Sequence, residues 1–560
     1  MPTRSRLIQS IALVVSVVVL CWGAASASSA ASSAKSSASA STQSEDGTQL
    51  PPGFIGYVGD VLTYHYNVAR QGQNTLETAL TLTNVNSTTF GKINFFTVDG
   101  KVDAQPLYVY KLPGTFHVQN TLFVVTEHAS IYAFDADAGT QTWKVSALLS
   151  GETPSDDHGC SQITPEIGIT DTPVIDRQKG PNGAMYLVAM SRDSSGNYHQ
   201  RLHALDLKTG VEMFGGPTEI QAKYPGTGDG SQGGFVIFAP GQYAPRAGLL
   251  EYGGKIYIGF TSHCDNRPYT GWLLAYDAGT LQQTGVLDLT PNGYEGAIWQ
   301  AGGGLAADSQ GSIYFLTGNG LFDTTLDGNG FPINGDYGNA FMKIAAGSQP
   351  TVSDYFTMYN TRQESNADED LGSGGAIVLP DLKDSNGQTR HLAVGSGKDT
   401  NIYVVDRDNM GKFNPNNDSA IYQELDGVLP GGIWASPAYF NSTVFYGPVS
   451  RSLRAFTITN ARLSTSPTSQ TSVTFPYPGT TPTVSANGNS NGIVWAIEAN
   501  NPAVLHAFDA TNLAKELYNS NQAGSRDQFG APNKFITPMV VNGKVFVGTT
   551  NGVAVFGLLP

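Results

Sequence analysis

The feature that most constrains this chain is a short pattern that recurs eight times. Each copy ends a β-rich segment, in most cases with a small or β-branched residue, a hydrophobic residue and then Asp. The copies end at Asp135, Asp206, Asp277, Ala345, Asp406, Thr457, Asp509 and Gly557, in steps of 71, 71, 68, 61, 51, 52 and 48 residues. Such spacing is typical of a repeat architecture in which the loops vary in length and the packed core persists.

Each copy has an upstream segment that begins with small residues or Pro, which suits the crowded inner rim of a radial array. These segments begin at Ala104, Thr172, Ala247, Gly303, Gly375, Ser436, Thr481 and Thr537. A turn and a second β-rich strand follow each of them, and an outer strand completes the unit. Four strands per unit and eight units predict an all-β fold, an eight-bladed β-propeller of four-stranded antiparallel blades.

The last unit predicts how the array closes. It stops at Pro560 directly after its third strand, while a spare β-rich segment, residues 92–98, precedes the first inner strand. We expect this N-terminal strand to join the last blade, because the pairing would remove an open sheet edge. A row of separate sandwiches would leave the segment without a role.

Composition supports many short strands. The 560 residues include 65 Gly and 30 Pro, which favour turns, and 40% hydrophobic residues, which supply a core. The net charge is −15 and no basic run is present, so binding of nucleic acid through its phosphates is not expected. We predict a single propeller domain over residues 57–560 and a monomer.

The N-terminus predicts export. Arg4 and Arg6 precede an apolar stretch over residues 11–22, and small residues at 25–27 match a cleavage site, so residues 1–27 are predicted to be a signal peptide. Residues 28–56 are predicted to be a disordered spacer rich in Ser and Ala. The expected location is secreted or periplasmic, without an integral membrane segment once the signal is removed. The alternative is a retained anchor, although the apolar run is shorter than the roughly 20 residues that span a bilayer.

Two cysteines remain after removal of the signal, and each lies next to a histidine. We predict a disulfide between Cys160 and Cys264, which suits an oxidising compartment. The alternative is a soft metal site made of these cysteines with His158 and His263, which has the right ligand types without a diagnostic spacing.

One repeat carries a family resemblance. Residues 133–140, Ala-Phe-Asp-Ala-Asp-Ala-Gly-Thr, followed by Trp143, resemble the repeat of the pyrroloquinoline-quinone (PQQ) propellers, and residues 204–210 are similar without the Trp. The entry segment with Asn67 and Arg70 resembles the start of quinoprotein alcohol dehydrogenases. The resemblance spans roughly residues 60–560. It implies a propeller fold with PQQ and calcium as the cofactors to consider, although the chain has no adjacent Cys-Cys pair of the kind that commonly covers the cofactor in this family.

The predicted blades bring distant loops to one face. The loop that enters each inner strand and the hairpin between the second and third strands emerge on the same side, where loops commonly carry function. The chemistry-bearing residues of these loops are Glu127, His128, His158, Glu166, His263, Glu295, Trp299, Asn319, Asp368, Glu369, Asp370, Lys398, Asp399, Trp434 and Arg451.

The acids of this face admit two roles. Asp368, Asp370 and Asn319 are candidate ligands for calcium, which takes six to eight oxygen atoms in irregular geometry. Asp370, Glu295 and Glu166 are candidates for the catalytic base of an alcohol oxidation. The glycine-rich loop 323–336 is a further, structural calcium candidate, although glycine-rich turns have the same composition.

The remaining candidates concern the cofactor. Trp299 and Trp434 offer flat surfaces on which a tricyclic quinone can stack. Lys398, His158 and His263 complete the predicted cofactor-binding set. The competing interpretation is that the acids are solvated loop charges and that the indoles fill gaps between blades.

These patterns predict an exported propeller that binds a small molecule on its loop-rich face and oxidises an alcohol or a sugar with a quinone. One alternative is a non-catalytic cell-envelope scaffold or a binding module for protein or polysaccharide. A polysaccharide-cleaving enzyme is the third possibility, because acids and aromatic rings also suit sugars.

Overall fold

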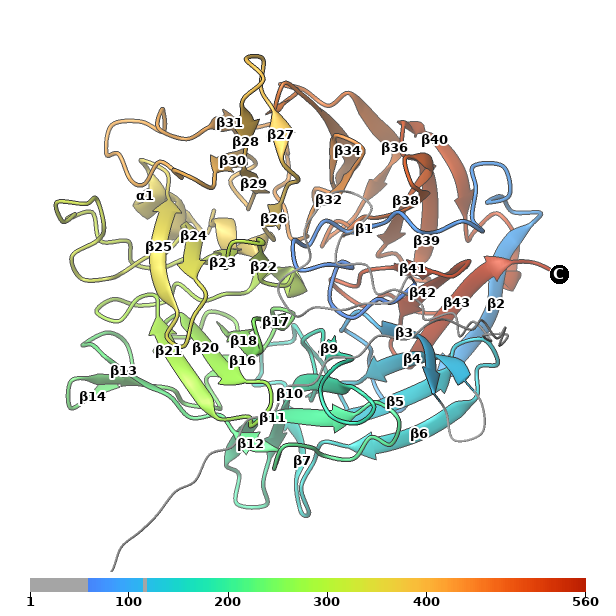
Figure 1. The fold of residues 1–560 in the computed structure, drawn as a ribbon, viewed down its shortest axis with the longest axis horizontal. Coiled ribbons are helices and arrows are strands. Elements are labelled where there is room, and N and C mark those ends of the chain that lie inside the picture. Colours follow the sequence, from blue (N-terminus) through green and yellow to red (C-terminus); the bar gives the residue numbers. More distant parts are fainter. Residues whose placement is uncertain (1–58, 114–117) are drawn as a thin grey trace, which may run out of the picture. The chain divides into compact units, whose positions relative to one another are not determined.

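The regular secondary structure of the described chain is almost entirely β-strand. The computed structural model describes residues 59–113 and 118–560 (Figure 1). The predicted signal peptide and spacer lie outside the described residues. The described part has one α-helix, α1 (Thr361–Ala367), and three short 3-10 helices, η1 (Gln300–Gly302), η2 (Leu371–Ser373) and η3 (Gly524–Arg526). No helix in the described ranges is long and apolar enough to cross a membrane.

Eight sheets of four or more strands follow one another along the described chain, and we number them sheet 1 to sheet 8. Sheet 1 contains β3 (Leu107–Pro113), β4 (Val118–Val125), β5 (Ser130–Asp135) and β6 (Gln141–Ser146). Sheet 2 contains β7 (Thr153–Asp156), β8 (Glu166–Ile167), β9 (Val174–Asp176), β10 (Ala184–Arg192), β11 (Tyr198–Asp206) and β12 (Thr218–Glu219). Sheet 3 contains β17 (Leu250–Tyr252), β18 (Lys255–Gly259), β20 (Trp272–Asp277) and β21 (Gln283–Asp288). Sheet 4 contains β22 (Ala306–Ala307), β23 (Ser312–Leu316), β24 (Phe341–Ala345) and β25 (Thr351–Phe356).

The second half of the chain continues this order. Sheet 5 contains β26 (Ile377–Val378), β29 (Leu392–Gly395), β30 (Ile402–Asp406) and β31 (Gln423–Leu425). Sheet 6 contains β32 (Ala438–Phe440), β33 (Thr443–Tyr446), β34 (Arg451–Thr459), β35 (Arg462–Leu463) and β36 (Ser469–Phe475). Sheet 7 contains β1 (Gln73–Asn74), β37 (Thr483–Asn487), β38 (Ser490–Glu498), β39 (Val504–Asp509) and β40 (Asn512–Asn519). Sheet 8 contains β2 (Phe90–Thr97), β41 (Met539–Val541), β42 (Lys544–Gly548) and β43 (Gly552–Leu558).

Three smaller sheets occupy connections. One contains β13 (Lys223–Pro225), β14 (Ser231–Gln232) and β15 (Phe235–Ile237). The others pair β16 (Tyr243–Ala244) with β19 (Thr261–Ser262), and β27 (Leu382–Lys383) with β28 (Thr389–Arg390).

The repeated Asp has a local structural role. In sheet 1, Asp135 Oδ1 accepts the backbone N–H groups of Asp137 and Ala138, each at 2.9 Å. In sheet 2, Asp206 Oδ1 accepts those of Lys208 and Thr209, each at 3.0 Å. An Asp side chain that satisfies the next N–H groups fixes a tight turn. The motif therefore marks the turn from the third strand of a sheet to its outer strand.

The predicted pairing between the two ends of the domain is present. β2 runs antiparallel to β43, from Phe90 opposite Leu558 to Thr97 opposite Gly552, and the two strands lie side by side in Figure 1. The sequence placed this strand at residues 92–98, within two residues of its observed bounds. An N-terminal strand thus completes the sheet built from the last strands of the chain.

The core of the described chain consists of eight clusters of buried apolar side chains, and each cluster joins two successive sheets. One of them joins sheet 8 to sheet 1, where the rings of Tyr108 and Phe546 lie 6.2 Å apart. Trp143 docks sheet 1 on sheet 2, because its indole N–H donates to Leu207 O at 3.1 Å. The ring of Trp143 lies so close to Gly210 that a Cβ there would come within 2.9 Å of it.

A segment ahead of β2 contacts one strand, or the residue before it, in every one of the eight sheets. We call residues 61–77 the hub segment. Its backbone or side-chain hydrogen bonds join Val61 to Tyr108, Leu62 to Ile175, Arg70 to Leu249, Val68 to Ala307, Ala69 to Val378, Gln71 to Tyr439, Gly72 to Val484 and Asn74 to Val540, all between 2.7 and 2.9 Å. The hub segment therefore holds the inner strands of distant sheets together.

Arg70 is the most heavily bonded side chain of the hub segment. It is fully buried, and its guanidinium donates to Thr63 Oγ1 and to the carbonyl groups of Tyr64, Leu249 and Leu305. These acceptors come from three stretches of the chain. A planar guanidinium with five donors in a fixed fork suits such a junction.

Candidate functional site

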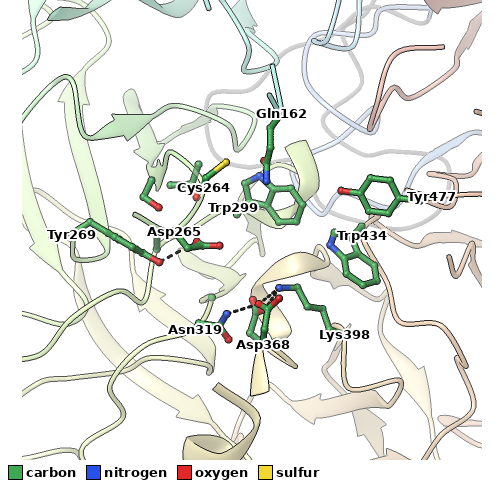
Figure 2. A pocket seen from close by; sticks show the side chains of 15 residues that line it. Gln162, Cys264, Asp265, Tyr269, Trp299, Asn319, Asp368, Lys398, Trp434 and Tyr477 are labelled. Atoms are coloured by element: carbon green, nitrogen blue, oxygen red, sulfur yellow. Dashed lines mark hydrogen bonds and ion pairs between the residues drawn. The ribbon is translucent and has the colours of Figure 1, made fainter. Parts of the chain in front are cut away.

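The loops at one end of sheets 2 to 7 enclose a cavity of about 290 Å³. Figure 2 shows its principal side chains. The lining residues are Gln162, Thr261, Ser262, Cys264, Asp265, Tyr269, Ala297, Trp299, Gly318, Asn319, Asp368, Asp370, Lys398, Trp434 and Tyr477. They come from the entry loops and second hairpins that the sequence pattern assigned to one face. Six of the predicted cofactor and metal residues lie together here: Trp299, Asn319, Asp368, Asp370, Lys398 and Trp434.

Helix α1 places the first of the two acids. Asp368 caps its C-terminus with a left-handed backbone (φ +61°), and this turn leads the chain to Asp370, just before η2. Ser365 of α1 accepts the N–H of Gly320 at 2.7 Å and so anchors the helix on the hairpin of sheet 4. The two acids are therefore held against the loop that carries Asn319.

Lys398 links both acids. Its ammonium lies 2.9 Å from Asp370 Oδ1 and also forms an ion pair with Asp368 Oδ1. Asn319 Nδ2 donates to the same Asp368 oxygen at 2.7 Å. Figure 2 shows Lys398, Asp368 and Asn319 meeting at one wall of the cavity. One cation thus balances two carboxylates.

Burial adjusts the protonation of this pair. Asp370 is 4% exposed. Burial raises its pKa, the Lys398 ammonium lowers it, and burial is the larger effect, so the pKa is raised overall. Burial disfavours the ammonium of Lys398, but the two carboxylates outweigh it and raise the pKa of the lysine. A carboxylate whose pKa lies above its ordinary value is better matched to proton abstraction near neutral pH than a solvated one.

Two further polar groups complete the oxygen-rich wall. Asn319 Oδ1 is buried and makes no hydrogen bond. Asp265 also lines the cavity; its Oδ1 accepts the hydroxyl of Tyr269 at 3.1 Å, and it forms no ion pair within the described part of the chain. Carboxylate and amide oxygens without a full set of partners are the donors that hard cations prefer.

Aromatic rings form the opposite wall. Trp299 packs edge-on against Phe535, with ring centroids 5.2 Å apart, and Phe535 in turn packs against Tyr477 at 6.3 Å. Trp434 lies 6.1 Å from Tyr477, and Lys398 Nζ lies 5.9 Å from the ring of Trp434. Tyr477 is 46% exposed and stands at the rim. The cavity therefore pairs an acidic wall with an aromatic one.

The disulfide lies beside this cavity. Cys160 and Cys264 are bonded, as predicted, with their Cα atoms 5.6 Å apart, which excludes the alternative soft metal site in this state. The bond ties the loop between β7 and β8 to the hairpin of sheet 3. The imidazoles of His158 and His263 stack at 3.9 Å next to it. Burial lowers the pKa of His158, and it lowers that of His263 to about 4, so both rings are neutral near pH 7.

Two predicted catalytic candidates do not line the cavity. Glu166 pairs with His128, its Oε1 lying 2.8 Å from His128 Nδ1. Glu295 lies behind the wall; burial and neighbouring carboxylates raise its pKa. His158 does not line the cavity either and reaches it only through His263 and the disulfide. Of the predicted bases, only Asp370 faces the cavity.

Sequence reasoning overlooked part of the lining. Gln162, Asp265, Tyr269 and Tyr477 carry no motif. Asp265 directly follows Cys264 in the hairpin of sheet 3, so the rule that collected His263 was sufficient to find it. Tyr477 follows β36 in the entry to sheet 7 and obeys the same rule.

Few side chains of the described residues are grouped in a way that suits a metal ion. No group of three or more His, Cys, Asp or Glu side chains is arranged to hold a metal ion within residues 59–113 and 118–560. In the loop 323–336, Asp327 Oδ1 accepts the N–H groups of Asn329 and Phe331, and Asp323 Oδ2 accepts that of Asn334. These acids fix the turns of the loop.

Solved structures of known proteins share this fold. A quinohemoprotein alcohol dehydrogenase from Comamonas testosteroni aligns with a TM-score of 0.59 and 13% identity over 89% of this chain and 80% of its own. The quinohemoprotein alcohol dehydrogenase ADHIIG from Pseudomonas putida HK5 gives 0.58 and 14% over the same shares. A europium-containing methanol dehydrogenase gives 0.55 and 12% over 90% of this chain and 98% of its own.

These likenesses concern the fold. No protein-family model matches the sequence, and no curated protein matches it. The three structures are propeller quinoproteins, which confirms the resemblance that the repeat sequence indicated. At 12–14% identity they do not establish what this chain binds.

Proposed function

We propose that this protein is an exported quinoprotein-type dehydrogenase, a closed eight-bladed propeller that oxidises an alcohol or a sugar in the cavity lined by Asp370 and Lys398. The observation that carries the proposal is the buried carboxylate of Asp370, paired with Lys398 at 2.9 Å, in a cavity that also presents two indoles. Acid, cation and flat aromatic surface are the groups that a quinone-dependent oxidation needs.

The closed ring is supported by three independent contacts. β2 pairs with β43, a cluster of apolar side chains joins sheet 8 to sheet 1, and the hub segment hydrogen-bonds to all eight sheets. Each sheet corresponds to one blade. These contacts support the single domain over residues 57–560 that is part of the proposal.

The cavity residues fit PQQ, a flat tricyclic quinone that carries three carboxylates. A volume of about 290 Å³ is of the size that small-molecule sites occupy. Trp299 and Trp434 would offer aromatic surfaces for its rings, and Lys398 would contact its polar edge. The cofactor supplies a quinone that accepts a hydride from the alcohol carbon.

A metal ion would be held on the acidic wall. Asp368, Asp370 and the unpartnered Asn319 Oδ1 are the oxygen donors of this chain for it. Three residues offer fewer donors than the six to eight of Ca²⁺, so oxygen atoms of the cofactor and of water would complete the shell. Lys398 pairs with both carboxylates, so the lysine and the metal compete for them.

Three residues of the chain would have separate roles in the reaction. Asp370 accepts the proton of the substrate hydroxyl, for which its raised pKa is suited. Lys398 keeps this carboxylate ionised and oriented before the proton is transferred. Tyr477 at the rim is placed to limit which substrates enter.

Reconstitution tests the proposal. The purified chain is incubated with PQQ and either Ca²⁺ or Eu³⁺, and reduction of an artificial dye is followed with a panel of primary alcohols and aldoses. We expect dye reduction with at least one of them, and about a 100-fold or greater loss in Asp370→Asn, because removal of a catalytic base typically costs 10²–10⁴ in rate. Glu166→Gln, outside the cavity, is the matched control and should remain active.

A negative result would favour the non-catalytic alternative. If PQQ and metal ions leave the melting temperature unchanged, neither binds the native state, because a ligand of the native state must raise its stability. The dehydrogenase proposal would then be wrong, and the face would be better understood as a scaffold or polysaccharide-binding surface.

A further inference from the structure

A second, smaller cavity adjoins the main one. It has a volume of about 20 Å³ and shares five wall residues with the main cavity: Gln162, Thr261, Ser262, Cys264 and Trp299. Room for one water molecule requires about 10–15 Å³. The small cavity therefore has space for one functional group that extends from the main cavity, and not for a separate ligand.

Arg246, between β16 and β17, supplies the only cationic side chain in the lining of this small cavity. It is 3% exposed, and its Nη1 makes no hydrogen bond within the described residues. The guanidinium lies 5.1 Å from the centre of the Phe535 ring, which itself packs against Trp299. A buried guanidinium with an unused donor is costly unless another group satisfies it.

The protein's own acids do not meet this need. The nearest carboxylate, Asp103 Oδ2, lies 3.9 Å from Arg246 Nη1, which is within ion-pair range but too far for a hydrogen bond. Glu127 and Asp171 form no ion pair with Arg246 among the described residues, and burial raises the pKa values of both acids, which favours their uncharged forms.

Asp157 also lines the small cavity but forms no ion pair with Arg246 among the described residues, and the other buried polar side chains of this wall are uncharged. Ser262 Oγ and His263 Nε2 line the small cavity and lack hydrogen-bond partners. The His263 ring is neutral near pH 7, so the positive charge of this cavity comes from Arg246 alone. The Ser262 hydroxyl can donate a hydrogen bond to an anion next to the guanidinium.

We infer that Arg246 is the carboxylate-binding residue of this site: one carboxylate of the ligand in the main cavity enters the small cavity and pairs with the guanidinium. Carboxylates match the planar fork of arginine better than they match other cations. The inference rests on the proposed function, for which PQQ supplies the carboxylates. It adds a second cation to Lys398, and Trp299 lines both cavities.

Binding measurements with two probes test the subsite. PQQ and its trimethyl ester share the quinone rings, but only PQQ carries carboxylates. Dissociation constants come from quenching of tryptophan fluorescence in wild type, Arg246→Met, Arg246→Lys and the control Arg267→Met. Arg267 is 46% exposed, pairs with Asp229 and lines neither cavity.

We expect Arg246→Met to weaken PQQ binding by about 10- to 100-fold, the range for a lost hydrogen bond to a charged group, and to leave ester binding unchanged. Arg246→Lys should fall between wild type and Arg246→Met, and Arg267→Met should bind like wild type. Thermal melting of each variant checks that it is folded, and Arg246→Lys serves if Arg246→Met does not fold.

The outcomes separate the two proposals. PQQ binding that is equal in wild type and in folded Arg246 variants would overturn the subsite alone. An equal loss of PQQ and ester binding would also overturn it, because the arginine would then act on the shape of the cavity. Absence of PQQ binding in wild type would overturn the proposed function and the subsite together.

Discussion

At the scale of single residues, the site depends on how one ammonium holds two carboxylates. Lys398 is 14% exposed in its side chain and Asp370 6%, so the pair is largely removed from water. Removal of one partner from such a pair leaves an uncompensated buried charge. The lysine therefore determines whether Asp370 can remain ionised in the folded protein.

Replacement of Lys398 by Met should destabilise the fold by about 3 kcal/mol at pH 7. The sign follows from Asp370. Its pKa is raised in the folded state, so its contribution is unfavourable above the unfolded value of 3.8, and loss of Lys398 raises the pKa further. The penalty should shrink toward pH 4, where the carboxyl binds a proton. Denaturant unfolding at pH 4 and pH 7 measures it.

A double variant isolates the charge. Lys398→Met with Asp370→Asn should recover most of the lost stability at pH 7, because the uncompensated carboxylate is gone. Lys383→Met, on exposed β27, is the control and should resemble wild type. A penalty in Lys398→Met that is equal at both pH values, or that the double variant does not relieve, would contradict this account.

The sequence located the acidic wall but not the whole cavity. Asp368, Asp370, Asn319 and Lys398 were found because they are polar residues in loops that a four-stranded blade brings to one face. The same rule also collected Glu166, and the structure shows this side chain paired with His128. Arg246 could not be identified as a cavity residue, because its burial depends on the packing of Phe535, nearly 300 residues later.

At the scale of structural elements, buried histidines tie strands together. In sheet 7, His506 of β39 contacts Glu516 of β40 at 2.7 Å through Nδ1 and Glu498 of β38 at 3.1 Å through Nε2. Burial lowers the pKa of His506, but the two glutamates outweigh it and raise the pKa overall. The imidazole thus joins three neighbouring strands, and both glutamates favour its charged form.

His506→Gln should destabilise the protein by about 3 kcal/mol near pH 6 and by less at pH 9. A raised histidine pKa gives stability that is complete below the unfolded value of 6.5 and is lost as the pH rises through the folded value. Unfolding at the two pH values measures this. His128→Gln is the control, because its pair with Glu166 is 46% and 29% exposed and should contribute little. A cost that does not depend on pH would show that packing, not charge, is what His506 supplies.

Elements differed in how far the sequence predicted them. The repeats were found because an Asp that also forms a turn ends five of the eight copies, so the pattern records a local hydrogen-bond requirement. The hub segment has no such signal. Its residues adopt irregular backbone, and their partners are carbonyl and N–H groups of eight separate strands, which leave no trace in residue type.

At the scale of the whole molecule, one strand joins the two ends of the domain. Gly552 of β43 lies opposite Thr97 of β2, and a Cβ at Gly552 would come within 2.4 Å of the Phe95 ring and 2.5 Å of Phe96 O. Because Phe96 O belongs to the backbone, a side chain at position 552 could be accommodated only if β2 moved. The pairing therefore requires a glycine at this position.

Gly552→Val should lower the stability of the protein by about 3 kcal/mol, the upper range for an overpacked contact, while unfolding stays a single transition. Calorimetry measures the melting temperature and the number of transitions. Gly328→Val is the control, because a Cβ at Gly328 meets nothing within 4 Å. Wild-type stability in Gly552→Val, or separate melting of the terminal sheets, would contradict the proposal that the pairing of β2 with β43 stabilises the whole fold.

The hub segment and β2 also determine when the protein can finish folding. Asn74 bonds to Val540, 466 residues later, so a ribosome has to produce almost the entire polypeptide before this partner exists. Sheets made early can form their own hairpins, but their contacts with the last sheet have to wait. A nascent chain delayed in this way needs protection from aggregation until its final strand arrives.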